Sequence, residues 1–210
     1  MNCDAIARWY RWLEYLAFGR ALERRRREYL DEAANARSVL VLGDGDGRFT
    51  AEFVDRNREA IVDSVDLSPR MLALAKRRTA DVSHVNFWRG DARTIALPRK
   101  YDLIVSHFFL DCFVARDLEL LIARVSDAAH PEARWLVSEF CLPGSGIRRI
   151  AAGLLIKAMY WFFWMTAGLK ASRLPDYSTS FELHGFRRVR HVPAMGGLLV
   201  SELWERRGKS

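Results

Sequence analysis

The chain has 210 residues, half of them apolar, which is enough to bury the core of one α/β domain without disulfide or metal staples. Its three cysteines, Cys3, Cys112 and Cys141, show no C-x-x-C spacing, so the sequence favours a reduced, cytoplasmic compartment and predicts no metal site. The formal net charge of +7 permits an anionic partner, but no nucleic-acid-binding signature accompanies it, so no nucleic-acid partner is expected.

Residues 5 to 34 repeat apolar side chains three and four positions apart, which predicts an N-terminal helix or helix pair. Charged residues interrupt each apolar run, so no signal peptide is expected. The densest basic run, Arg24 to Arg27, would fan around such a helix. We interpret it as a solvated helix surface in preference to a nucleic-acid patch.

Strand-length apolar runs and helical stretches then alternate along the chain. The expected strands lie at 38–42, 61–65, 85–89, 102–106 and 134–140, and the expected helices at 49–59, 69–79 and 116–129. A long apolar helix at 147–169 and a hairpin-type pair of strands at 186–192 and 197–204 are expected to follow. Buried strands joined by helical crossovers indicate a mostly parallel sheet covered on both faces.

The stretch VLVLGDGDGRFT, at residues 39–50, places three glycines directly after a buried strand. Glycines there let the backbone turn sharply and let a ligand lie against the main chain. In an open α/β sheet, ligands bind beyond the carboxyl ends of the strands where the strand order reverses. The glycine turn therefore predicts one edge of a ligand site.

The spacing of this turn restricts the ligand. A dinucleotide fingerprint would need a glycine where Arg48 stands, which disfavours a nicotinamide or flavin. Asp44 and Asp46 would repel a pyrophosphate but suit a ligand with positive charge, such as a sulfonium with an amino-acid tail. Asp66 ends the second expected strand and could accept both hydroxyls of a ribose. Asp91 follows the third and could accept a hydrogen bond from an adenine amino group.

Four segments taken together resemble class I S-adenosylmethionine-dependent methyltransferases, over residues 38 to about 140. They are VLVLGDGDG for the first motif, VDSVDLSPRMLALAKRR for the ribose-binding strand and helix, NFWRGDA for the adenine-binding segment and YDLIVSHFFLDCF for the fourth strand with its loop. The resemblance implies S-adenosylmethionine as the cofactor and a cofactor site formed by Gly43, Asp44, Gly45, Asp46, Gly47, Asp66, Leu67, Asp91, Ala92 and Ser106. The family usually has an acidic residue where this chain has Val41, so Asp44 or Asp46 is expected to bind the methionine amino group instead.

The resemblance also implies a Rossmann-like α/β fold, with a seven-stranded, mostly parallel sheet, helices on both faces and an antiparallel C-terminal strand. Residues 1–210 are expected to form a single methyltransferase domain. Within it we expect a helical cap at 1–36, a cofactor-binding half at 37–141 and an acceptor-side half at 142–210.

Methyl transfer from a sulfonium is an in-line displacement that depends mainly on positioning, and it needs a base only when the acceptor must lose a proton. His107, just past the fourth strand, is the candidate base, and packing beneath Phe108 and Phe109 is an equally good explanation of it. Asp111 could orient His107 or cap the next helix. Glu139 and Cys141 flank the end of the fifth strand and could line an acceptor pocket.

The apolar segment at 150–169 is long enough to cross a bilayer, yet the strands on both sides of it should join one sheet, so no crossing is expected. Five successive aromatic residues at 160–164 point all around a helix, so some of them should face a pocket, a partner or lipid. The downstream RLPDYSTSFELHGF resembles the C-terminal part of quinone-biosynthesis methyltransferases. Basic residues at 148, 149, 170 and 173 bracket the segment and favour peripheral contact with an anionic membrane.

The expected function is therefore methylation of a small, hydrophobic or aromatic acceptor. Two other functions stay open from the residues alone. A nucleotide-dependent oxidoreductase is disfavoured by Arg48 in the glycine turn. A non-catalytic S-adenosylmethionine-binding or membrane-associated partner protein would have the same cofactor motifs without turnover.

Overall fold

The computed structural model describes residues 18–79, 82–167 and 174–208. Residues 5–17 of the helix expected at 5–34 lie outside these ranges. The part that is described contains α2, Ala21–Arg26, followed by irregular turns that lead to the first strand.

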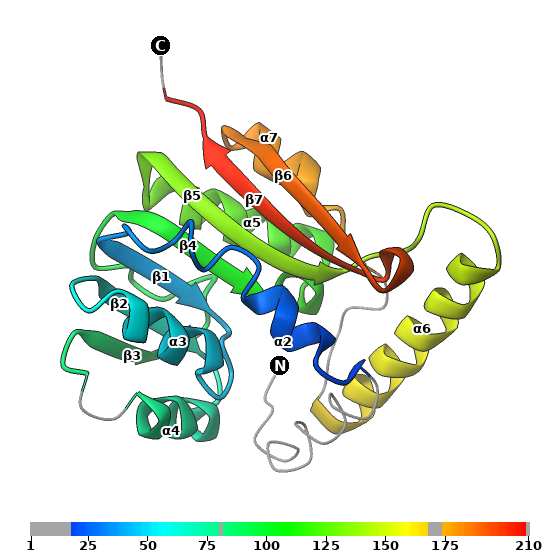
Figure 1. The fold of residues 1–210 in the computed structure, drawn as a ribbon, viewed down its shortest axis with the longest axis horizontal. Coiled ribbons are helices and arrows are strands. Elements are labelled where there is room, and N and C mark those ends of the chain that lie inside the picture. The colour runs from blue at the N-terminus through cyan, green and yellow to red at the C-terminus, as the bar shows by residue number, and fades with distance from the viewer. Residues whose placement is uncertain (1–17, 80–81, 168–173, 209–210) are drawn as a thin grey trace.

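One seven-stranded sheet forms the centre of the molecule, in the order β3-β2-β1-β4-β5-β7-β6 (Figure 1). Its strands are β1 Ser38–Leu42, β2 Ile61–Asp66, β3 Val85–Arg89, β4 Tyr101–His107, β5 Ala129–Phe140, β6 Phe186–Ala194 and β7 Leu199–Arg206. The first five strands pair in parallel, and β7 runs antiparallel between β5 and β6. The expected Rossmann-like fold with an antiparallel C-terminal strand is confirmed.

The connections between strands are mostly helical. They are α3 Arg48–Arg56, α4 Pro69–Arg78, α5 Ala115–Asp127, α6 Ile147–Ala167 and α7 Tyr177–Leu183, with short 3-10 turns η1 Leu110–Cys112 and η2 Met195–Gly197. The chain leaves β1 outward to β2 and β3 and then returns to β4 on the other side of β1. The strand order therefore reverses between β1 and β4, where ligands bind in open α/β sheets.

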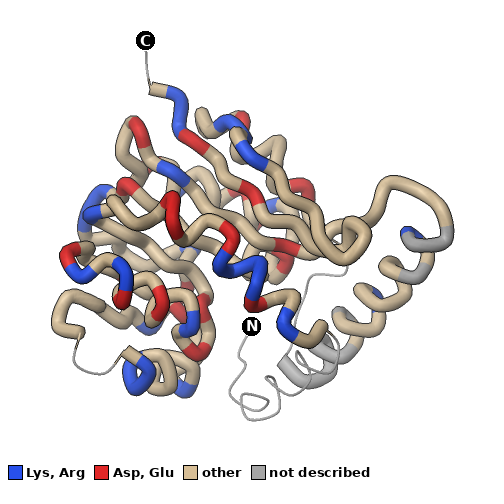
Figure 2. The backbone as a smooth tube through the Cα atoms, in the orientation of Figure 1, with Lys and Arg blue, Asp and Glu red and all other residues tan. Residues whose placement is uncertain are grey.

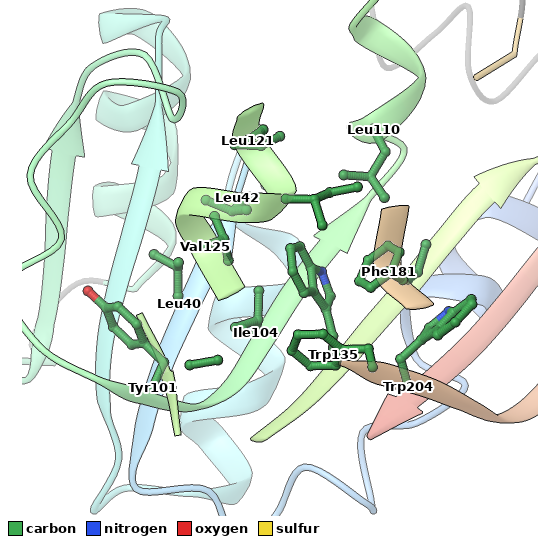
Figure 3. Close-up of a cluster of buried hydrophobic side chains, with 14 of the residues drawn as sticks. Leu40, Leu42, Tyr101, Ile104, Leu110, Leu121, Val125, Trp135, Phe181 and Trp204 are labelled. Atoms are coloured by element: carbon green, nitrogen blue, oxygen red, sulfur yellow. The ribbon is translucent and has the colours of Figure 1, made fainter. Parts of the chain in front are cut away.

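Alternate residues of β1 enter two cores on opposite faces of the sheet. Val39 and Val41 pack with Phe49 and Phe53 of α3, whereas Leu40 and Leu42 lie in the same core as Leu121 of α5. Figure 3 shows this second core, which continues through Trp135 to Phe181 of α7 and Trp204 of β7. Because both faces are covered, the strand runs read as continuously apolar in the sequence.

A third, smaller cluster lies where α6 meets the sheet. Ala152 and Ile156 of α6 pack with Phe18, Phe140 and Leu199. Only this side of α6 contributes buried residues to the described clusters, and Figure 1 shows the helix standing at one end of the sheet.

Several elements differ from the sequence expectation; for example, α3 ends at Arg56 where a helix to residue 59 was expected. The helix expected to reach residue 129 ends at Asp127, because Ala129 already pairs with Tyr101 and extends β5 beyond the expected 134–140. The strand expected from 197 begins at Leu199, because η2 occupies the hairpin connection. The helix α7 was not expected at all. It begins at Asp176, whose carboxylate accepts hydrogen bonds from Ser178 N and Thr179 N.

Candidate cofactor and acceptor site

The glycine turn connects β1 to α3 at the reversal point of the sheet. Gly43 has φ +64° and Gly47 has φ +79°, conformations that favour glycine. A Cβ on Gly43 would lie 2.2 Å from the Phe109 ring, and one on Gly47 would lie 2.6 Å from Ala75 Cβ. A Cβ on Gly45 would meet nothing within 4 Å. Gly43 and Gly47 therefore lack a side chain because neighbouring residues pack against their backbone. Only the backbone of Gly45 in this turn has open space beside it for a ligand.

The two aspartates of this turn bind other groups of the protein. The Asp44 carboxylate accepts hydrogen bonds from Phe49 N at 3.2 Å and from Thr50 N and Oγ1 at 2.9 and 2.7 Å, and so caps the first turn of α3. Burial raises the pKa of Asp44, and its bonds to Thr50 oppose the rise. Asp46 forms ion pairs with Arg78 at 2.7 Å and Arg48 at 3.1 Å.

Asp66 and Asp91 lie at the ends of neighbouring parallel strands, β2 and β3. Asp66 Oδ1 accepts the N–H of Ser68 at 2.8 Å, and the next residue, Leu67, is 40% exposed. Asp91 accepts the backbone N–H and the guanidinium Nε of Arg93, both at 2.9 Å, and these contacts lower its pKa. The adjacent Ala92 is buried. Both carboxylates thus stand at the carboxyl edge of the sheet in fixed local turns.

Ser106 and His107 end β4 on the other side of the reversal point. Ser106 is fully buried, and its Oγ accepts the indole N–H of Trp135 at 2.9 Å. His107 is 7% exposed and packs edge-on against the Phe49 ring, with 5.2 Å between ring centroids. Neither ring nitrogen of His107 has a hydrogen-bond partner among the described residues. Burial, reinforced by the charge of Arg26, lowers the pKa of His107 to about 3, so the imidazole is neutral at neutral pH.

Asp111 lies in η1, and no hydrogen bond joins it to His107. The next helix, α5, has Val114 and not Asp111 at its N-cap. Asp111 accepts a weak hydrogen bond from Cys112 Sγ at 3.6 Å, and burial raises its pKa to about 6. Its position after β4 is as expected, and a role in catalysis stays a prediction.

Glu139 proves more deeply embedded in this region than the sequence indicates. Its Oε1 accepts the backbone N–H of Phe109 at 3.0 Å and of Leu110 at 2.7 Å, so it holds the loop that follows β4. The side chain is 1% exposed, and burial together with the nearby Asp111 raises its pKa well above the usual range. Burial and the nearby Asp111 carboxyl group thus both favour the protonated form of Glu139.

Arg26 is the residue of this region that the sequence interpretation missed. Its guanidinium carbon lies 5.2 Å from the centroid of the Phe108 ring, and its charge acts on both His107 and Asp44. Neighbouring Arg27 instead binds Glu52 on α3. Neighbouring arginines of one basic run thus point to different groups, Arg26 to Phe108 and Arg27 to Glu52. Helical fanning separates the four arginines, but only the docking of α2 shows which of them faces the site.

Among the residues with described positions, no group of three or more His, Cys, Asp or Glu is arranged to hold a metal ion. Within the same described residues, no helix is both long and apolar enough to span a membrane.

Residues 39–132 match a family model described as a methyltransferase domain. Two curated relatives show the same class. The malonyl-[acyl-carrier protein] O-methyltransferase of Halalkalibacterium halodurans is 33% identical over 90 residues, which are 41% of this chain and 32% of that protein. The trans-aconitate 2-methyltransferase of Mycobacterium marinum is 30% identical over 136 residues, which are 62% of this chain and 47% of that protein. The chain thus spans less than half the length of either relative.

Solved structures share the fold at low sequence identity. The N-methyltransferase NodS from Bradyrhizobium japonicum, in complex with S-adenosyl-L-homocysteine, aligns with a TM-score of 0.64 at 15% identity, over 89% of this chain and 87% of that one. A putative O-methyltransferase from Nostoc punctiforme aligns with a TM-score of 0.70 at 17% identity, over 93% of this chain and 60% of that one.

The sheet topology, the glycine turn at its reversal point and the matched domain together define a class I S-adenosylmethionine-dependent methyltransferase fold. The resemblance expected from the sequence is confirmed, and S-adenosylmethionine is the cofactor of this class. The matched segment includes the glycine turn, Asp66 and Asp91, and residues 133–210 lie beyond it.

Proposed function

We propose that the protein is an S-adenosylmethionine-dependent methyltransferase that acts on a small, hydrophobic or aromatic acceptor. The observation that carries the proposal is the shared sheet edge. Open backbone at Gly45 and the carboxylates of Asp66 and Asp91 follow three adjacent parallel strands, beside the strand-order reversal. These groups fit an adenosine with a cationic methionine end, because each part of that ligand meets a group of matching chemistry.

In this proposal Asp66 accepts hydrogen bonds from the ribose hydroxyls and Asp91 from the adenine amino group. Asp44 and Asp46 place negative charge beside the open backbone of Gly45, where they favour a positively charged amino-acid end. When bound, S-adenosylmethionine supplies a methyl group activated on a sulfonium. The remaining residues of the proposed cofactor site, Leu67, Ala92 and Ser106, lie at or just after the ends of β2, β3 and β4.

His107 would face the acceptor from the end of β4. With a pKa of about 3, its imidazole is unprotonated at neutral pH and can accept a hydrogen bond from an acceptor O–H or N–H. So low a pKa makes it a weak base, and we therefore propose that His107 orients the acceptor more than it removes a proton. Asp111 and Glu139 keep the loop after β4 in place beneath the acceptor.

An apolar acceptor is supported by the composition of the acceptor-side half. The helix α6 is apolar over most of its length, and its inner side packs beside Phe140 at the end of β5. Phe108 packs against the same Phe140 ring, with 5.3 Å between centroids. Aromatic side chains therefore cover the end of the sheet next to His107. We further propose that the protein meets a membrane only peripherally and that residues 1–210 act as one domain.

The cofactor half of the proposal is tested at Asp66. Asp66→Ala should weaken S-adenosylmethionine binding by roughly 1.5–3 kcal/mol, the value of charge-assisted hydrogen bonds. Isothermal titration calorimetry measures this loss, with Asp55→Ala, an exposed carboxylate on α3, as the matched control. Unchanged affinity in Asp66→Ala would remove the ribose assignment. Binding of NADH in preference to S-adenosylmethionine would support the oxidoreductase alternative.

The acceptor half needs a turnover screen with phenols, quinones, apolar amines and polar metabolites. We expect methyl transfer to members of the apolar or aromatic set. Activity confined to polar metabolites would contradict this expectation. Tight cofactor binding without turnover on any acceptor would favour a non-catalytic binding protein.

A further inference from the structure

The side of α6 that faces away from the sheet presents large apolar side chains. Ile150, Leu154 and Trp161 are 66%, 64% and 61% exposed. Their spacing, with Lys157 between them, is four, three and four residues, so the four side chains form one stripe along the helix. We call this stripe the outer face of α6. The described part of the chain has twelve exposed large apolar side chains, and three of them belong to the outer face of α6.

The opposite side of the same helix is already buried. Ala152 and Ile156 are 7% and 6% exposed, and they pack in the cluster at the end of β5 and β7. The helix α6 therefore already contacts the sheet through its inner side, and the outer face is not needed for that contact. A helix that is apolar on both sides, with one side covered by protein, leaves a second apolar surface to be covered by something else.

The charge around this helix is strongly one-sided. Residues 140–175 contain five Lys and Arg and no Asp or Glu. Without these five, the chain's 33 basic residues become 28 against 26 acidic ones, so five of the seven excess positive charges lie in this one segment. Figure 2 shows blue and no red on the described part of α6, while both colours mix over the rest of the molecule. The partner that this surface matches is both apolar and negatively charged.

We propose that the outer face of α6 docks the protein on the surface of an anionic lipid bilayer, with the helix lying in the interface. Ile150, Leu154 and Trp161 would enter the boundary between headgroups and acyl chains, where tryptophan is favoured. Lys157 lies in the middle of the stripe, and its long side chain can keep its ammonium group among the headgroup phosphates.

A second copy of the chain is a poorer occupant. In a closed dimer, one surface meets the identical surface of its partner, so two basic segments would face each other across the symmetry axis. Lys157, halfway along the outer face, would lie close to its own symmetry mate and destabilise the contact. A lipid surface has no such conflict. This inference concerns surface binding alone and does not depend on methyl transfer.

The test is flotation of the full chain with vesicles of phosphatidylcholine, with or without phosphatidylglycerol. We expect binding to the anionic vesicles that weakens as salt is added. The triple variant Ile150→Ser, Leu154→Ser, Trp161→Ser should bind at least about tenfold more weakly, because it removes most of the apolar area that inserts. Lys157→Glu should weaken binding to anionic vesicles and leave the weak binding to neutral ones unchanged.

The matched control is Leu120→Ser, Leu183→Ser, which changes two exposed leucines on α5 and α7 that are 55% and 73% exposed. It should float as the wild type does. Calorimetry of S-adenosylmethionine binding and circular dichroism verify that each variant is folded. If the triple variant does not fold, the single substitution Lys157→Glu still tests the outer face. The proposal is overturned if the wild type fails to bind anionic vesicles, if it binds neutral vesicles as strongly as anionic ones, or if the triple variant floats unchanged. A wild-type dimer that the triple variant dissociates would also overturn it in favour of a second copy.

Discussion

Gly43 and Gly45 have nearly the same left-handed backbone, with φ of +64° and +62°, but different surroundings. An alanine at either position should cost about 1–2 kcal/mol of unfolding free energy because of this conformation. Only Gly43→Ala also pushes a methyl group into the Phe109 ring, which should cost about 1–3 kcal/mol more. Urea unfolding of both variants measures the difference. Equal losses of stability would show that Phe109 moves aside freely.

His107 should make the folded protein sensitive to acid. Its folded-state pKa of about 3 lies below the 6.5 of an unburied histidine, so the unfolded chain binds more protons between these values. Stability is therefore lost as the pH falls through that window, by about 2 kcal/mol from this group at about pH 5. His107→Gln, which does not titrate, should gain about that much relative to wild type between about pH 8 and pH 5.

Urea unfolding of the wild type and His107→Gln at both pH values gives this difference. The carboxyl group of Asp111, with its pKa raised to about 6, acts in the opposite direction. It is present in both proteins, so the comparison cancels it. A constant gap between the two proteins at all pH values would mean that His107 is not the titrating group.

For single residues, the sequence predicted the place along the sheet better than it predicted the side-chain contacts. Asp66, Asp91 and His107 lie at the strand ends where the alternation of elements places them. That Asp44 binds the backbone of α3 and that Arg26 approaches His107 could not be predicted, because both depend on how helices dock on the sheet. Burial of Glu139 under the loop after β4 was equally hidden, since a carboxylate at a strand end looks exposed in a sequence.

Among the elements, α3 has an unusual start that can be tested. Its N-cap residue is Gly47, which has no side chain to bind the free N–H groups of the first turn. Asp44 supplies those hydrogen bonds from three residues earlier. Asp44→Ala should therefore lower the unfolding free energy by about 1–2 kcal/mol, as the loss of a cap does elsewhere.

Asp44→Asn is the matched variant for this test, because it keeps one acceptor oxygen and removes the charge. It should lose less stability than Asp44→Ala in thermal unfolding. If S-adenosylmethionine affinity falls in Asp44→Asn while stability is largely kept, the charge acts on the methionine end of the ligand. An alanine variant as stable as the wild type would remove the capping role.

Helices and buried strands were predictable because each has a strong local pattern, and their central residues agree with the structure. The end of α5 and the start of β5 were not, because the chain passes directly from one to the other at Ala128, and the nearest proline, Pro131, lies inside β5 and does not mark its start. The helix α7 is only seven residues long, too short for a periodic pattern to identify it.

For the molecule as a whole, we predict one cooperative unfolding transition. The cofactor-side and acceptor-side halves share one sheet, because β5 pairs with both β4 and β7. Trp135 of the cofactor-side half and Trp204 of the acceptor-side half are fully buried and both pack against Phe181, so both lie in a core that the two halves share. Urea transitions followed by tryptophan fluorescence and by far-ultraviolet circular dichroism should coincide. Two separated transitions would show that residues 142–210 unfold independently and would contradict a single domain.

The position of β7 also determines when the sheet can be completed during synthesis. The ribosome makes β6 before β7, yet β7 lies between β6 and β5. When β6 leaves the exit tunnel it has no strand of the sheet to join, and the edge of β5 stays open. Both edges close together only after β7 has emerged and forms its antiparallel pairs on either side. The nascent protein therefore presents an unpaired strand edge, a site where chaperones bind or strands of other chains add, until the final segment of this sheet is translated.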